Sequence, residues 1–241
     1  MKRTVPVDYE GLWRRTVIRR SNGGSDSTTR VWWLQSSRFH IDLRIPADRP
    51  AVADAAALAL LPPDQLARYA AQTGFAGVTA VDGTRCAWHP EIAFPYVSSE
   101  VDAGEMRFDS PDHLHETGLD DSYEEDWLRE PSGAMRGVRL QDPHGAAIAY
   151  LLISERWAAW ACGRPDDEFA ADAFQPQRCS EFSIFHRQDG WTIVASNFPW
   201  LEKTASCEAD ALDPATARQW QVGQLVTIPW SEVPWKISDI A

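Results

Sequence analysis

The segment from Cys86 to Trp127 holds most of the side chains in this sequence that could do chemistry. Within it, His89 and Glu116 can each accept a proton, so a cavity enzyme would use one of them as its proton acceptor. Glu116 could also pair with Glu125 or Asp126, but such carboxylate pairs are frequent simply because the chain is acidic. The segment has no complete catalytic signature. No Ser-His-Asp or Cys-His residues in the chain have the sequence spacing that is typical of a nucleophilic catalytic motif. The catalytic residues, and whether there is catalysis at all, stay open.

Two histidines in this segment have a spacing that is also found in some β-barrel metal sites. His113 and His115 lie two residues apart on an expected strand, which places both imidazoles on the same face. Glu116 follows immediately and therefore points to the other face, and the remaining ligands of a cupin motif are missing. An exposed strand or turn explains the pair more simply, so we expect no metal site.

Composition and charge restrict the classes of partner. The chain has 241 residues, of which 44% are hydrophobic, and this is enough for a sizeable core. Its formal net charge is −12 at pH 7, whereas phosphate binding requires clustered Lys and Arg. The basic run at 14–20 is interleaved with apolar residues, as in a strand. We therefore expect no nucleic-acid partner and no membrane partner.

The N-terminus and the cysteines indicate a cytoplasmic protein. The first residues carry charge but no apolar signal region, and no apolar run approaches the length of a membrane helix. The cysteines have no CxxC spacing, so reduced thiols are expected, although a disulfide stays open. They are Cys86, Cys162, Cys179 and Cys207.

Alternating segments separated by turn residues predict a mainly β protein. In 38–45, Phe39, Ile41, Leu43 and Ile45 share one strand face, and His40, Asp42 and Arg44 share the other. The polar face is either solvated or, in a barrel, directed into the cavity. The dipeptide Asp82-Gly83 predicts a tight hairpin turn, as does Asp189-Gly190. The run 147–163 is so apolar that we expect it to be buried on both sides.

The element order favours one closed antiparallel sheet. About a dozen strands are expected with no βαβ alternation, and closure removes exposed sheet edges. An Ala-rich stretch with Pro62-Pro63 predicts short helices inserted at about 48–74. We predict a single barrel domain over 1–241, with extra strands and loops after about 164.

Several motifs resemble the lipocalin-like (calycin) β-barrels, in particular a family of uncharacterised bacterial proteins. These motifs are Gly11-x-Trp13 with Arg15 close behind, 75–92, Asp102-x-Gly104-x-Met106 and LHETGLDDSYEEDW, and the likeness spans about residues 8 to 130. It implies a lipocalin-like barrel with a cavity, in which the tryptophan closes one end and packs against an arginine. It implies no activity. Some intracellular barrels of this kind bind haem through one histidine, for which His186 and His89 are the candidates. A lone strand histidine is more often structural, and we expect no cofactor.

The predicted function is binding of a small, largely apolar molecule in the barrel cavity. Strand alternation nominates as lining residues Trp33, Trp88, His89, Met106, Phe108, Glu116, Tyr123 and Trp127. One alternative is a cavity enzyme with His89 or Glu116 as proton acceptor, which would show a buried carboxyl group of raised pKa beside a cavity. The other is a structural or interaction protein whose barrel is filled by side chains. A homodimer and the identity of the ligand stay open.

Overall fold

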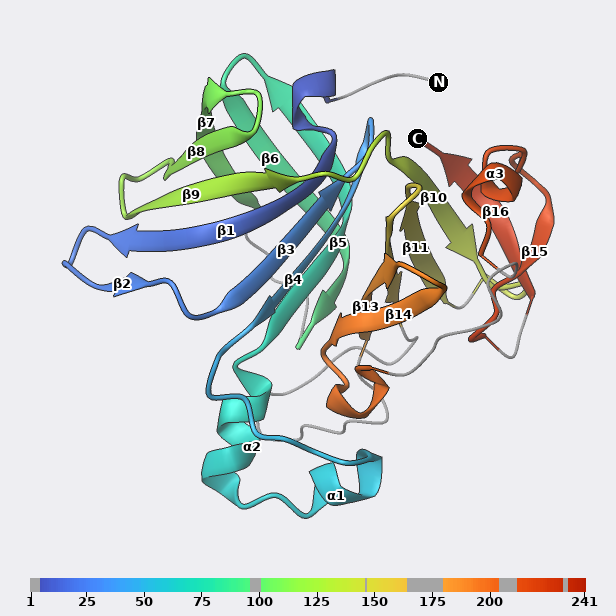
Figure 1. The fold of residues 1–241 in the computed structure, drawn as a ribbon, viewed down its shortest axis with the longest axis horizontal. Coiled ribbons are helices and arrows are strands. Elements are labelled where there is room, and N and C mark those ends of the chain that lie inside the picture. Colours follow the sequence, from blue (N-terminus) through green and yellow to red (C-terminus); the bar gives the residue numbers. More distant parts are fainter. Residues whose placement is uncertain (1–4, 96–100, 146, 164–179, 204–211, 232–233) are drawn as a thin grey trace.

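Two antiparallel sheets make up the described part of the protein (Figure 1). The structure is a computed structural model, and it describes residues 5–95, 101–145, 147–163, 180–203, 212–231 and 234–241. The strands of the first sheet are β1 (Gly11–Arg20), β2 (Ser25–Asp26), β3 (Arg30–Gln35), β4 (Phe39–Ile45), β5 (Thr73–Asp82), β6 (Arg85–Phe94), β7 (Asp102–Ser110), β8 (His113–Gly118) and β9 (Tyr123–Glu130).

The first sheet closes into a barrel. Strands β1 and β3 to β9 pair in sequence, and β9 returns to pair with β1 from Leu12 opposite Glu130 to Arg20 opposite Tyr123. The turn predicted at Asp82-Gly83 joins β5 to β6. The result is an eight-stranded antiparallel barrel with β2 as a short addition beside β1. The predicted fold class, a lipocalin-like antiparallel barrel with short helices, is confirmed.

The strands after the barrel form a second sheet with its own strand order, β14-β13-β12-β11-β10-β16-β15. They are β10 (Arg136–Gln141), β11 (Ile148–Ile153), β12 (Trp157–Cys162), β13 (Glu181–Arg187), β14 (Trp191–Ser196), β15 (Leu225–Thr227) and β16 (Pro234–Ile240). The hairpin predicted at Asp189-Gly190 joins β13 to β14. In the described part of the chain, strands 136–162 thus belong to this sheet and not to the barrel wall.

The apolar face of β4 lies on the outside of the barrel and packs against the second sheet. Phe39, Ile41 and Leu43 share one buried cluster with Tyr150 and Leu152 of β11. Because side chains alternate along a strand, the polar face of β4 is directed into the barrel. Of the two readings that the sequence left open for this face, the structure takes the barrel interior.

Strand β11 is buried on both sides, as its composition predicts. Tyr150 and Leu152 contact the barrel, while Leu151 and Ile153 belong to a separate cluster on the far face of the second sheet. That cluster also contains Trp160 of β12 and residues of the short helix α3 (Pro214–Ala217).

Four further short helical segments lie among the described residues. The 3₁₀ helix η1 (Val7–Tyr9) precedes β1 and packs on one barrel end, whereas η3 (Pro199–Leu201) follows β14. The predicted helical insertion contains α1 (Ala55–Ala59) and α2 (Pro63–Ala70), which lie together below the barrel in Figure 1. Within the described ranges, every helix is too short or too polar to cross a membrane.

Candidate functional site

Four tryptophan rings fill one half of the barrel interior. Trp33 lies at their centre, with its ring centroid 6.2 Å from that of Trp13, 5.4 Å from Trp88 and 5.7 Å from Trp127. None of the four is more than 4% exposed. These rings occupy the space themselves, so this half is a packed core.

Trp13 seals the end of the barrel that we call the closed end, together with Tyr9 and Phe108. Its indole N–H donates to the carbonyl oxygen of Tyr9 over 2.8 Å, and the Tyr9 ring packs edge-on against Phe108. The guanidinium of Arg129 lies 4.3 Å above the Trp13 ring. The resemblance predicted a tryptophan packed against an arginine; Arg129 on β9 is that arginine.

Arg15 has a different role, at the opposite end of the barrel, which we call the mouth and which carries Arg44, Asp102 and Tyr123. Its guanidinium lies 2.5 Å from Glu125, and both side chains are at most 6% exposed. Arg44 donates to Asp42 over 2.8 Å and lies 3.7 Å from Asp102.

Buried charges at the mouth depend on their partners. A buried charge is costly unless it is paired, so removing one member of either pair leaves the other uncompensated. Burial, reinforced by Glu125 and Asp102, raises the pKa of Asp42 to about 6 even though Arg44 acts in the opposite direction.

Glu116 is the buried carboxyl group at the mouth that is bound by neutral donors. Tyr123 donates its hydroxyl proton to Oε1 over 2.7 Å, and the indole of Trp127 donates to Oε2 over 3.2 Å. Glu116 is 3% exposed and lies opposite Glu125 in the β8–β9 register. Burial raises its pKa to about 8, and the charges of Glu125 and Asp102 act in the same direction. Glu116 therefore retains its proton at neutral pH.

Two glycines make room for Glu116 and Tyr123 on the barrel wall. Gly104 on β7 lies opposite Gly118 on β8. A Cβ atom at Gly104 would lie 2.7 Å from Cγ of Glu116, and one at Gly118 would lie 2.6 Å from the Tyr123 ring. The glycines of two motifs that carried the lipocalin resemblance thus allow both side chains to lie flat against the sheet.

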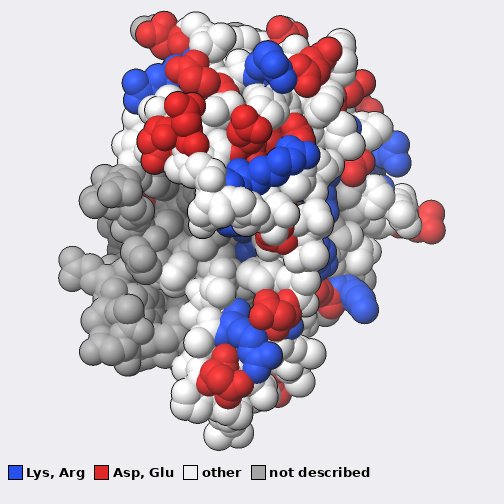
Figure 2. All heavy atoms as spheres, turned by 90° about the vertical axis from the view of Figure 1, so that its left-hand side faces the viewer, with Lys and Arg blue, Asp and Glu red and all other residues white. Residues whose placement is uncertain are grey.

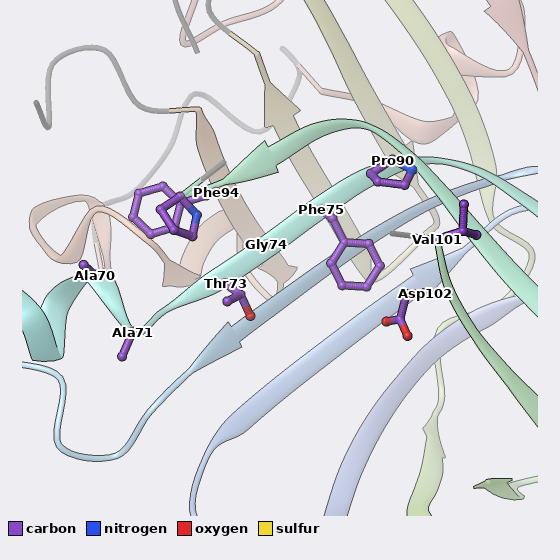
Figure 3. Close-up of a pocket in the computed structure, with 10 residues that line it drawn as sticks. Ala70, Ala71, Thr73, Gly74, Phe75, Pro90, Phe94, Val101 and Asp102 are labelled. Atoms are coloured by element: carbon purple, nitrogen blue, oxygen red, sulfur yellow. The ribbon is translucent and has the colours of Figure 1, made fainter. Parts of the chain in front are cut away.

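A pocket of about 590 Å³ opens at the mouth, beside the start of β5 and the end of β6 (Figure 3). It is lined by Ala70, Ala71, Thr73, Gly74, Phe75, Pro90, Phe94, Pro95, Val101 and Asp102. The Phe75 ring and the Asp102 carboxylate project into the same space in Figure 3. Arg44, paired with Asp102, also lies 5.3 Å from the Phe75 ring, so the pocket borders the charged groups of the mouth.

A bulge in β6 shapes this pocket. In the β5–β6 register, Ala76 lies opposite Ile92 but Gly77 lies opposite Pro90, so Glu91 is an extra residue. It reverses the alternation: Trp88 faces the barrel interior, whereas Ile92 and Phe94 join the cluster between the barrel and the second sheet.

The predicted lining residues fall into three groups. Trp33, Trp88, Met106, Trp127 and Phe108 belong to the packed aromatic interior, and Glu116 and Tyr123 belong to the mouth. His89 is exposed on the outer face of β6, away from both. None of the eight is among the residues that line the 590 Å³ pocket. The structure adds Asp42, Arg44 and Phe75. Alternation along β4 places Asp42 and Arg44 on one face, but that this face points inward follows from the second sheet that covers the other one.

The three histidines considered as metal or haem ligands besides His89 lie outside the barrel interior. His113 and His115 are on the outer face of β8, where Nδ1 of His115 lies 2.9 Å from a carboxylate oxygen of Asp126. His186 is in the second sheet, stacked on Trp157 with a centroid distance of 4.2 Å. Within the described residues, no three His, Cys, Asp or Glu side chains come together as a metal site. Cys86 is a buried free thiol, and Cys179 and Cys207 lie outside the described residues.

Comparison with known proteins supports the fold and gives no activity. No protein-family model and no curated protein matches the chain. Among solved structures, the uncharacterized protein YLR301w from Saccharomyces cerevisiae is 14% identical, with a TM-score of 0.60 over 95% of this chain and 98% of that one. A lipocalin-like protein from Bacteroides uniformis is 12% identical, with a TM-score of 0.34 over 51% of this chain and 99% of that one. The first likeness extends over both sheets, so the two sheets together form a fold that occurs in another protein.

Proposed function

We propose that this protein binds one small, largely apolar molecule at the mouth of its barrel. The observation that carries this proposal is the 590 Å³ pocket, whose lining is mainly alanine, proline, valine and phenylalanine side chains. Small-molecule sites are typically concave and apolar with a few placed polar groups, and barrel mouths are a preferred location for them. Here Asp102 on the lining and the Arg44 guanidinium beside it are the polar groups.

The packed aromatic half supports this location of the ligand. A ligand between Trp33, Trp88 and Trp127 would have to displace rings that already contact one another. A ligand in the pocket needs no such rearrangement, because the space beside Phe75 and Pro90 is already present.

The charge of the surface argues against an anionic ligand. The face that carries the β1–β2 and β8–β9 hairpins has acidic and basic side chains interspersed (Figure 2). The chain as a whole carries a formal net charge of −12, so its surface does not attract anions such as nucleic-acid phosphates. We therefore expect no nucleic-acid partner.

The proposal is tested by a substitution that fills the pocket, with binding of a fluorescent probe as the measurement. A neutral hydrophobic fluorescent probe should bind saturably to the wild-type chain and change its tryptophan fluorescence. Ala71→Trp places a large ring on the lining at an exposed position, and it should weaken probe binding at least about tenfold because the ring occupies the site. Ala67→Trp is the matched control: Ala67 is exposed on α2, whose C-cap is Ala71, but it is off the lining, so this variant should bind like wild type.

Two results would overturn the proposal: no saturable binding to the wild-type chain, or equal binding by both variants. Either would favour the interaction-protein alternative, which the filled aromatic half of the barrel already fits.

A cavity enzyme that uses Glu116 is a second candidate. A buried carboxyl group of raised pKa is one sign of such an enzyme, and Glu116 is 3% exposed with its pKa raised to about 8 by burial, although it does not line the 590 Å³ pocket. The other proton acceptor considered, His89, is exposed and far from such an environment. If Glu116 transfers protons, a molecule that copurifies with the protein should be converted by wild type and bound unchanged by Glu116→Gln. Conversion at the same rate by both would exclude this role.

A further inference from the structure

Two side chains of the barrel interior each leave one buried polar atom without a partner among the described residues. They are His40, through Nε2, and Trp88, through its indole N–H. Both side chains are at least 96% buried, since His40 is 0% and Trp88 is 4% exposed. Buried polar groups nearly always have partners, so a pair of unmet atoms in one interior points to a missing group.

The hydrogen bonds around His40 establish that its free nitrogen is an acceptor. The amide nitrogen of Gln35 donates to two backbone carbonyl groups, so its side-chain oxygen faces the other way. That oxygen accepts the hydroxyl proton of Thr79 over 2.8 Å. Thr79 must then accept from Nδ1 of His40, which lies 3.0 Å from its oxygen. With the proton on Nδ1, Nε2 carries a lone pair.

His40 also stays uncharged. Burial lowers its pKa to about 3, and the charge of His89 acts in the same direction. It therefore offers an acceptor at neutral pH and no positive charge that could attract an anion.

Trp88 lies beside His40, with the opposite hydrogen-bonding character. Thr79, which binds the imidazole, is the cross-strand partner of Trp88 in the β5–β6 register. An indole nitrogen can only donate. The other three tryptophans of the cluster donate to Tyr9, Gln35 and Glu116, respectively. The unmet donor of Trp88 and the unmet acceptor of His40 thus flank the same threonine.

These two atoms lie directly behind the pocket. The His40 ring packs against Phe75 with a centroid distance of 5.5 Å, and Phe75 lines the pocket. Pro90, two residues from Trp88 on β6, lines it as well. Neither His40 nor Trp88 lines the pocket itself, so a ligand group reaches them only when the Phe75 side chain turns aside.

We propose that the ligand carries a hydroxyl group at its buried end, which accepts from the indole of Trp88 and donates to Nε2 of His40. This inference rests on the proposed function, and it narrows the ligand to an apolar alcohol or phenol. A hydroxyl both donates and accepts, so it satisfies both atoms. A carboxylate could not donate to His40 and would lie near Asp42 and Glu116, whereas an ammonium could not accept from Trp88.

An alcohol and its methyl ether test whether the ligand hydroxyl donates a hydrogen bond to His40. Octanol and octyl methyl ether share the same chain and accepting oxygen, but the ether has no proton to donate. In competition against the neutral probe, wild type should prefer octanol about tenfold, the worth of one well-made buried hydrogen bond. His40→Phe, which has no acceptor, should lose this preference.

Trp88→Phe tests whether the ligand oxygen accepts a hydrogen bond from the indole of Trp88, and a control variant is compared with it. This variant should weaken octanol and the ether by the same factor, since both oxygens accept, and should keep the preference between them. His89→Phe is the control, because His89 adjoins Trp88 in sequence but is exposed on the other face, and it should change neither ligand. Each variant is first shown to bind the probe, and Trp88→Phe keeps the test decisive if His40→Phe does not fold.

The outcomes separate this inference from the proposed function. Equal binding of octanol and ether by wild type, while the probe still binds, would overturn the hydroxyl and leave a pocket whose two unmet atoms are bridged by water alone. Failure of the wild-type chain to bind the probe would instead overturn the proposed function itself.

Discussion

The two ends of the barrel interior are built from opposite kinds of side chain. At the closed end, Trp13 is fully buried, with its N–H bound and Arg129 over its ring. At the mouth, Glu125 and Glu116 are as deeply buried but depend on Arg15 and Tyr123 for hydrogen bonds. Apolar burial stabilises a fold directly, whereas buried charges cost stability unless each is compensated. The closed end thus provides stability, and the mouth has the polar groups that a binding site needs.

Removing the tryptophan of the closed end should lower the stability of the protein more than any change at the mouth. Trp13→Ala should lower the free energy of unfolding by about 3 to 5 kcal/mol, because it deletes a fully buried ring and leaves a cavity. Denaturant titration measures this loss. A loss below about 1 kcal/mol would show that the closed end does not anchor the barrel.

A methyl group on the mouth wall should have a smaller effect. Gly104→Ala places a Cβ atom 2.7 Å from Cγ of Glu116 and should cost about 1 to 3 kcal/mol, as overpacking of a filled site does. Gly190→Ala is the matched control, since a Cβ atom there meets nothing within 4 Å. If both variants had the same stability, Glu116 would be free to move and the mouth would not be preorganised.

The buried carboxyl group of the mouth should make stability depend on pH. Glu116 has a folded pKa of about 8 against an ordinary value of 4.5, so the folded state retains its proton when the unfolded state has lost it. The stability that this provides is fully present below about pH 4.5 and is lost as the pH rises to about 8.

Glu116→Gln isolates this contribution. The variant should gain stability relative to wild type as the pH rises through that range, because glutamine has no proton to lose, while the contribution of Asp42 cancels in the difference. Urea titrations of both proteins at several pH values give the difference. A difference that is constant with pH would mean that Glu116 ionises normally.

The sequence predicted the architecture better than the location of the site. Alternation in 38–45 correctly separated Phe39 and Ile41 from His40 and Asp42, because the side-chain period of a strand is local. It could not show that the apolar face is the outer one, since the second sheet that covers it comes from residues far along the chain. For the same reason, the motif at Trp13 was visible, but its partner Arg129 depends on the pairing of β1 with β9.

The candidate lining residues show the same limit. Trp88 and His89 are neighbours on one strand, so alternation places them on opposite faces, and the structure puts Trp88 inside. The pocket depends on the bulge at Glu91, which has no periodic signal in the sequence. It also depends on where α2 lies against the barrel, which the predicted helical insertion alone does not give.

The central claim is that the mouth holds one small molecule, and native mass spectrometry of the purified full chain tests it most directly. After incubation with octanol, the wild-type chain and Ala67→Trp should each carry one added molecule that is released on denaturation, and Ala71→Trp should carry none. The claim would be contradicted if the wild-type chain had the mass of the polypeptide alone, or if Ala71→Trp retained the molecule as well as wild type does.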